Sequence, residues 1–184
     1  MYSGINFNAS PDTASQEVSK RQPDPVSNDA QPKPKSEGPG RLIQEMLQLL
    51  SFAEQLRVQS HLIHFNYEGA NFTGIHAFLK DEYEMHQHHF DKLGELIRSM
   101  DYMTFMCMKG LLGAYKKFKH CESYDPKDML LTYMKNLEDF AMLSKKVAKS
   151  AKKMEAIDVE NYMAHLVEVS FKASWFVKAT LRRS

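Results

Sequence analysis

The chain has 184 residues, of which 43% are hydrophobic and 26% are charged, and its formal net charge is +1. This length and apolar content are enough for one hydrophobic core, and the small net charge argues against a nucleic-acid binder that is basic over its whole surface. The two cysteines lack metal-site spacing and fit a reducing cytoplasm. Because the sequence has no apolar run of 18 residues and no N-terminal leader, we expect neither a membrane span nor a secretory signal.

Residues 1–39 differ in composition from the rest of the chain. They contain six of the seven prolines, many small polar residues and few large apolar ones. Such a segment cannot bury enough apolar surface to offset its ordering entropy, so we expect a disordered tail at 1–39 and one folded domain at 40–184. The tail has four basic and five acidic residues. It would release few counterions from DNA, so DNA binding through it has weak support.

Four segments have the apolar periodicity of amphipathic helices. The first covers about 41–69 and the second about 71–100. Asp125-Pro126 is a start signal for the third, and Asp158 is a candidate N-cap for the fourth. The residues expected to face the core on the first and third helices are Leu42, Met46, Leu49, Ala53, Leu56, Ser60, Ile63 and Tyr67, and Leu130, Tyr133, Leu137, Phe140, Ser144, Val147 and Ala151. Those on the second and fourth are Phe72, Ile75, Leu79, Tyr83, His86, Phe90, Leu93 and Ile97, and Tyr162, Leu166, Val169, Ala173 and Phe176.

The lengths of the connections predict how these helices pack. Short turns near Gly69 and Ala156 make each flanking pair of helices an antiparallel hairpin, whereas about 25 residues separate the second helix from the third. The chain is therefore predicted to be all-α, a four-helix bundle with one long crossover.

Two histidines and two carboxylates give the strongest chemical signal. His64 and His76 are twelve residues apart, and Asp91 and Glu95 lie one turn apart on the same predicted helix as His76. Imidazoles and carboxylates together suit an iron-group or zinc ion. His76 precedes Asp91 by about 22 Å along the helix, so the two cannot share an ion within one chain. A second copy, packed antiparallel across a two-fold axis, would bring them together in an intersubunit site.

Each of these residues has a simpler interpretation when taken alone. The histidines could be hydrogen-bonded core residues, and the carboxylates could form a solvated helix face. The polar run 86–89 spreads over most of a helix circumference, so its three histidines cannot converge on one ion. His86 is then a core or dimer-interface residue, and His88 alone is kept as a candidate ligand.

The stretch around the candidate ligands resembles the signature of Dps proteins, the mini-ferritins named as DNA-binding proteins from starved cells. The resemblance covers roughly residues 41–181 and rests on His64-Phe65-Asn66, Gly69, Asn71-Phe72, His76, Asp91 and Glu95 in the run DKLGELIR, and Lys172, Trp175 and Phe176. It implies a ferritin-like four-helix bundle whose crossover carries a short extra helix, here within 102–119. The apolar side chains that would then pack at a subunit contact are Met103, Phe105, Met106, Leu111 and Leu112.

The resemblance also implies a function. Dps proteins form hollow shells of twelve subunits in the cytoplasm, some of them associated with the nucleoid. They bind Fe(II) between two-fold partners, oxidise it with hydrogen peroxide or dioxygen, and store the ferric mineral. For this chain the implied iron ligands are His64, His76, Asp91 and Glu95. The acidic residues that could line an iron-entry pore, or simply cap a helix, are Glu155, Asp158 and Glu160.

One position departs from the family's pattern. Its bridging iron ligand is an Asp four residues after the second His, where this chain has Lys80. An ammonium group donates hydrogen bonds and repels a cation, so three outcomes are open. Lys80 pairs with the neighbour's carboxylates and silences the centre, it turns to solvent and leaves a weaker site, or other ligands compensate. Glu84 and His88 are the candidates for compensation, since both lie within about 60° of Asp91 around the helix.

The alternative function follows from this departure. A Dps-like shell whose centre is modified or blocked by Lys80 would act as a structural, DNA-protecting or other-metal-binding particle, with zinc as one candidate metal. The lysines that could contribute an exterior DNA contact, or simply solvate the third helix, are Lys145, Lys146, Lys149, Lys152 and Lys153.

Overall fold

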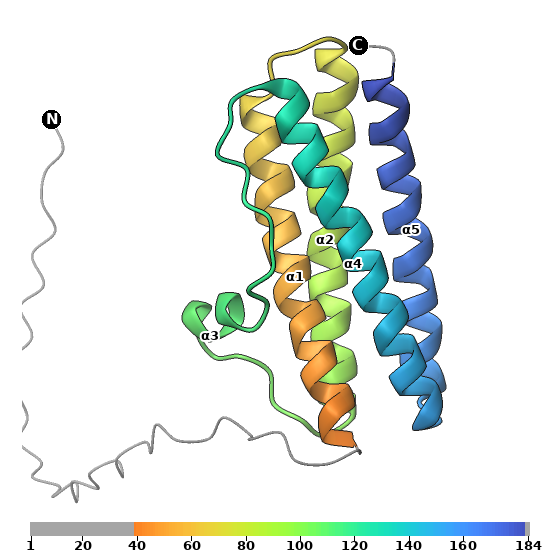
Figure 1. Cartoon of the computed structure of the whole chain (residues 1–184). Helices are drawn as coiled ribbons and strands as arrows, with labels where there is room; N and C mark the ends of the chain where they lie inside the picture. Colours follow the sequence, from red (N-terminus) through yellow and green to blue (C-terminus); the bar gives the residue numbers. More distant parts are fainter. Residues whose placement is uncertain (1–38, 183–184) are drawn as a thin grey trace, which may run out of the picture. The chain divides into compact units, whose positions relative to one another are not determined.

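The computed structural model describes residues 39–182, which form five helices and, within that range, no strand (Figure 1). The helices are α1 (Pro39–Asn66), α2 (Phe72–Ser99), α3 (Met108–Gly113), α4 (Pro126–Lys153) and α5 (Ile157–Leu181). Nearly all of the predicted tail, residues 1–38, lies outside the described residues. None of the helices between 39 and 182 has the length and apolar character that a membrane span requires.

The four long helices form the predicted bundle. α1 and α2 make one antiparallel hairpin, α4 and α5 make the other, and α1 packs against α4. In Figure 1 the crossover leaves the end of α2, carries α3 along the side of α1, and enters α4 at the opposite end of the bundle. The all-α class, the four-helix bundle and the single long crossover with a short extra helix are therefore confirmed.

The core stripes predicted for α1 and α4 are correct, because every residue assigned to them is buried. On α2 five of the eight predicted residues are buried, Tyr83 and Phe90 are half-buried, and Phe72 is 48% exposed. Phe72 is the first residue of α2, and its ring lies 5.3 Å from the His76 ring rather than in the core.

The stripe predicted for α5 is partly wrong. Leu166 and Ala173 are buried, but Phe176 is 45% exposed and the remaining two residues are only half-buried. The residues that face the core in their place are Val159, Met163, Ser170, Ser174 and Val177. Apolar residues cover more than one side of α5, as the exposed Phe171 and Trp175 show, so periodicity alone did not identify the packed side.

One of the two predicted helix caps is correct. The Asp125 carboxylate accepts a hydrogen bond from the Asp128 N–H at 2.9 Å and so caps α4. Asp158 was predicted to cap α5 but lies inside its first turn, and the N-cap is Ala156. The reason is a tight turn after α4, in which the Ala156 N–H donates to the Ala151 carbonyl at 3.1 Å. This turn leads straight into α5, where the Asp158 carboxylate still faces the positive end of the helix dipole.

The crossover is fixed to the bundle by side-chain amides. The Lys119 N–H donates to Asn136 Oδ1 at 3.1 Å, and the Lys119 carbonyl accepts from both Asn136 and Gln59. Gln55 holds the Tyr115 carbonyl in the same way at 3.0 Å. These bonds give the buried amides of α1 and α4 partners and set the path of residues 115–119.

Part of the apolar surface of the crossover is buried against its own bundle. Leu111 is buried, and Phe105 is half-buried where it packs against the core. Met103 and Met106 are 76% and 97% exposed, and Leu112 is also exposed. These three remain candidates for the predicted contact.

Candidate metal site

The paired histidines lie where α1 ends and α2 begins. A short turn joins the two helices, with Asn71 in the left-handed conformation (φ 56°) and the Tyr67 hydroxyl donating to the Ala70 carbonyl at 2.9 Å. The turn brings His64 and His76 into contact, with their ring centroids 3.7 Å apart and the rings stacked. His64 is buried and His76 is half-buried. The local fold therefore pairs two residues that are twelve positions apart.

Reciprocal hydrogen bonds fix the tautomer of both rings. His64 Nδ1 lies 2.9 Å from the His76 carbonyl oxygen, and His76 Nδ1 lies 3.1 Å from the His64 carbonyl oxygen. A carbonyl oxygen only accepts hydrogen bonds, so each Nδ1 carries the hydrogen. Each Nε2 is then left with a lone pair, the form of histidine that binds a metal ion. Both interpretations of the histidines thus apply, because they are hydrogen-bonded and still able to act as ligands.

The two carboxylates are not brought to the histidines of their own chain. Asp91 and Glu95 are exposed further along α2, and Glu95 lies 3.6 Å from the Lys92 ammonium. Within residues 39–182, no three His, Cys, Asp or Glu side chains gather as a metal site would require. Within one chain the two imidazoles and the two carboxylates therefore lie apart, as the two half-sites of the predicted intersubunit site would.

Lys80 is directed along its own helix. Its ammonium nitrogen lies 3.4 Å from Glu84 Oε1, and both side chains are more than half exposed. In the single chain Glu84, a candidate for compensation, is thus engaged by the lysine itself. His88, the other candidate, is exposed.

Aromatic rings surround the histidine pair. The His61 ring stacks on Tyr83 at 4.0 Å, and the Phe65 ring lies 4.5 Å from His61 and 5.6 Å from His64. Phe65 stands where many Dps proteins have a tryptophan, and its side chain is 66% exposed. The histidine pair is therefore flanked by aromatic rings on this side.

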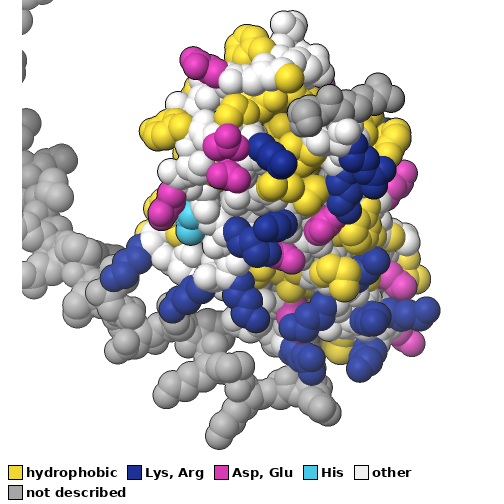
Figure 2. Space-filling model, turned by 45° about the horizontal axis from the view of Figure 1, so that its top comes forward, with side chains coloured by type: hydrophobic (Ala, Val, Ile, Leu, Met, Phe, Trp, Pro, Cys, Tyr) yellow, Lys and Arg dark blue, Asp and Glu magenta, His cyan; other side chains and the backbone are white. Residues whose placement is uncertain are grey.

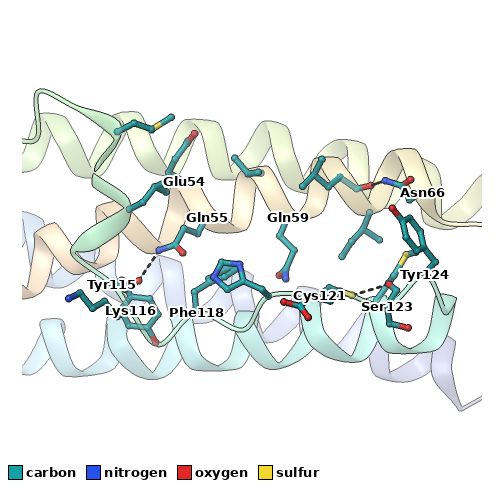
Figure 3. Close-up of a pocket in the computed structure, with 18 residues that line it drawn as sticks. Glu54, Gln55, Gln59, Asn66, Tyr115, Lys116, Phe118, Cys121, Ser123 and Tyr124 are labelled. Atoms are coloured by element: carbon teal, nitrogen blue, oxygen red, sulfur yellow. Dashed lines mark hydrogen bonds between the residues drawn. The ribbon is translucent and has the colours of Figure 1, made fainter. Parts of the chain in front are cut away.

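A groove runs along the outer side of α1. It has a volume of about 890 Å³ and lies between α1 and the crossover, with Gln55 and Gln59 on one side and Phe118 and Tyr124 on the other (Figure 3). Leu62, Ile63 and Asn66 line its end, on the side of α1 away from His64. Exposed apolar residues of the groove are Val58, Leu62, Met108 and Leu112.

Sequence reasoning missed one polar cluster inside the bundle. Glu82 on α2 is 5% exposed and accepts a hydrogen bond from the Tyr133 hydroxyl at 2.8 Å. Burial raises the pKa of Glu82 to about 7, and burial together with the nearby His89 lowers the pKa of His86 to about 3. The signal available in the sequence was the one-turn spacing of Glu82 and His86, the latter already assigned to the core.

Charged side chains elsewhere are at the surface. Among the pore candidates, Glu155 and Asp158 are exposed and Glu160 is half-buried. In Figure 2, Lys and Arg side chains gather toward the lower edge of the visible face. Of the five α4 lysines named above, Lys146 also pairs with the buried Glu45 at 3.1 Å.

The comparisons with known proteins agree on the fold. A family model described as a ferritin-like domain matches residues 43–184. No curated protein matches the chain significantly. Solved structures that it resembles include Dps from Vibrio cholerae O1 (TM-score 0.71, 19% identity, 77% of this chain and 89% of that chain). Dps from Thermosynechococcus elongatus matches with a TM-score of 0.74 and 17% identity, over 77% of this chain and 90% of that chain. Dps from Staphylococcus aureus matches with a TM-score of 0.74 and 15% identity, over 79% of this chain and 98% of that chain.

Proposed function

This chain belongs to the ferritin-like family, and on that basis we propose that it is a mini-ferritin that oxidises Fe(II) and stores the Fe(III) product. The observation that carries the proposal is the histidine pair, whose Nδ1 hydrogens are held by carbonyl oxygens while both Nε2 atoms remain available. Asp91 and Glu95 of a two-fold partner would complete the site. The Vibrio cholerae protein is described as a member of a superfamily of ferritin-like diiron-carboxylate proteins, which supports iron as the metal.

The α1 groove supports contact with a second copy of this chain. Val58 and Leu62 are 38% and 54% exposed on the outer side of α1, where they line the groove. A second α1 packed here would bury this apolar surface. A twelve-subunit shell, with Glu155, Asp158 and Glu160 near iron-entry pores and a cytoplasmic or nucleoid-associated location, completes the proposal.

The proposed ligand set suits the two-electron reduction of hydrogen peroxide by two Fe(II) ions. Two Fe(II) ions lose one electron each, the O–O bond of hydrogen peroxide accepts both electrons, and two protons are taken up to give two water molecules. Imidazole nitrogens bind Fe(II), and carboxylates stabilise the higher charge of Fe(III). Holding two iron positions close together allows both electrons to be taken without release of a hydroxyl radical.

Addition of Fe(II) under anaerobic conditions, followed by hydrogen peroxide, tests this function. We expect oxidation faster than in protein-free buffer, about two Fe(II) consumed per peroxide, and a core of many irons per assembly that co-migrates with the protein. Absorbance of Fe(III) and iron analysis of the purified assembly measure both. Oxidation at the protein-free rate, with no retained core, would rule the function out.

The second candidate function rests on Lys80. Because its side chain occupies the position of the bridging Asp and is exposed, the centre would bind a second metal ion weakly and act mainly on zinc or another divalent ion, as part of a structural or DNA-protecting particle. The α4 lysines would supply the DNA contact. A gel-shift assay at low salt tests this part, and absence of any shift removes it.

Replacing Lys80 with aspartate should raise the rate of Fe(II) oxidation about tenfold. The change removes a positive charge from the centre and adds a carboxylate ligand, and changes to a metal site of this kind alter affinity or activity by about 10- to 100-fold. Lys80→Gln is the matched control, because it removes the charge without adding a ligand. Equal rates for Lys80→Asp, Lys80→Gln and the natural chain would show that position 80 is not part of the centre.

A further inference from the structure

A second set of metal-binding side chains is buried within one chain, between α2 and α4. Glu82 and His86 lie one turn apart on α2, and Tyr133 reaches them from α4. The Tyr133 hydroxyl donates to Glu82 Oε2 at 2.8 Å, and His86 Nε2 lies 2.9 Å from the same hydroxyl oxygen and 3.7 Å from Glu82 Oε2. All three residues are at most 5% exposed.

The three donor atoms have the spacing of metal ligands. Oxygen and nitrogen atoms bonded to an ion at about 2.0–2.2 Å lie roughly 2.9–3.5 Å from one another. The separations of 2.8, 2.9 and 3.7 Å between Tyr133 Oη, Glu82 Oε2 and His86 Nε2 bracket that range. An ion just outside the plane of these atoms would reach all three with little movement of the side chains.

The hydrogen bonds leave the cluster incompletely satisfied. The Tyr133 hydrogen is used on Glu82, so His86 Nε2 must donate to the Tyr133 oxygen. His86 Nδ1 is then a buried acceptor with no partner among the described residues. A core position that is polar and incompletely paired costs stability, so packing alone does not account for Glu82 and His86 at this place.

We propose that Glu82, His86 and Tyr133 bind one divalent first-row metal ion in each chain, separately from the intersubunit iron site. One carboxylate and one phenolate balance the two positive charges of the ion, as a buried site requires. Binding replaces the hydroxyl hydrogen of Tyr133 and any proton on Glu82, and these protons leave to solvent. The hydrogen on His86 Nε2 moves to Nδ1, so that Nε2 offers its lone pair to the ion. The phenol is the third donor, which explains why His, Cys, Asp and Glu side chains alone do not make up a site in residues 39–182.

Zinc binding to a variant without the histidine pair tests the proposal. Zn²⁺ is added to the metal-free His64→Ala/His76→Ala protein, excess ion is removed, and zinc per chain is measured. We expect one zinc per chain, a zinc anomalous peak between α2 and α4 in crystals, and the ultraviolet difference band of an ionised tyrosine. In the same background, Glu82→Gln and Tyr133→Phe should each lose the zinc and the band.

Tyr162→Phe is the matched control. Tyr162 also bonds a buried histidine, since its hydroxyl lies 2.9 Å from His89 Nδ1, but it does not touch the cluster. This variant should keep both the zinc and the band. Absence of zinc from the histidine-free protein, or zinc retained in both folded Glu82→Gln and Tyr133→Phe proteins, would overturn the proposal. Neither result bears on Fe(II) oxidation by the intersubunit site.

Discussion

Two inactive variants should recover Fe(II) oxidation when their chains are combined in one assembly. The first variant lacks both imidazoles (His64→Ala/His76→Ala), and the second lacks both carboxylate charges (Asp91→Asn/Glu95→Gln). Each should oxidise Fe(II) with peroxide no faster than protein-free buffer does. When the two chains are co-expressed in equal amounts, we expect about one quarter of the activity of the natural protein.

The value of one quarter follows from two-fold symmetry. A pair that contains one chain of each kind has two sites, one with all four ligands and one with none of them. Random pairing makes half of all pairs mixed, so about a quarter of the sites are complete. A site built from one chain alone would give no recovery, because neither chain carries all four ligands.

Mixing the two variants after assembly provides the control. No activity should appear until the subunits are dissociated and reassembled together, as judged by the initial rate of Fe(III) formation. Failure to recover activity in co-assembled protein of proven mixed composition would show that the two half-sites do not meet. The measurement is independent of the Lys80 question, because both chains retain that residue.

The parts of the fold that were predicted correctly depend on local sequence features, such as the spacing of apolar residues along a helix. On α4 one side is apolar and the other polar, so the buried stripe could be predicted from spacing. On α1 the predicted stripe is buried, but so are Ile43, Leu50 and Phe52 outside it. α5 did not allow a prediction from spacing, since Phe171 and Trp175 place apolar side chains on an exposed side as well. Which side packs is decided by the facing helix, and that information is not local.

The candidate site could likewise be predicted only in part from local spacing. Spacing identified His64 and His76 as a pair, but the mutual carbonyl bonds depend on the turn between the helices and became visible only in the structure. Glu82 was missed because carboxylates are usually solvated. Its burial depends on Tyr133, a residue 51 positions later in the chain.

The buried Glu82 should make stability depend on pH in a direction opposite to that of an ordinary salt-bridged carboxylate. Burial raises its pKa from 4.5 to about 7, outweighing the lowering effect of the Tyr133 hydrogen bond. The folded chain thus holds a proton that the unfolded chain releases near pH 4.5. The contribution of Glu82 is fully present below that pH and is lost as pH rises through 7, by about 2–3 kcal/mol between pH 5 and pH 8.

Replacing Glu82 with glutamine isolates this contribution. The glutamine side chain cannot ionise but keeps an acceptor for the Tyr133 hydroxyl, so the free energy of unfolding of the variant relative to the natural metal-free chain should rise by about 2–3 kcal/mol from pH 5 to pH 8. His86 and His89, whose lowered pKa values reduce stability in acid, are present in both proteins and cancel in the difference.

Glu84→Gln is the control, because Glu84 is exposed one turn from Lys80 and its pairing is worth little in water. Urea denaturation at several pH values measures both differences. A Glu82→Gln difference that stays constant from pH 5 to pH 8 would mean that Glu82 ionises at its ordinary pH in the folded chain. The same carboxylate would then already carry the negative charge that the proposed metal ion needs, so the pH profile also determines how many protons zinc must displace on binding.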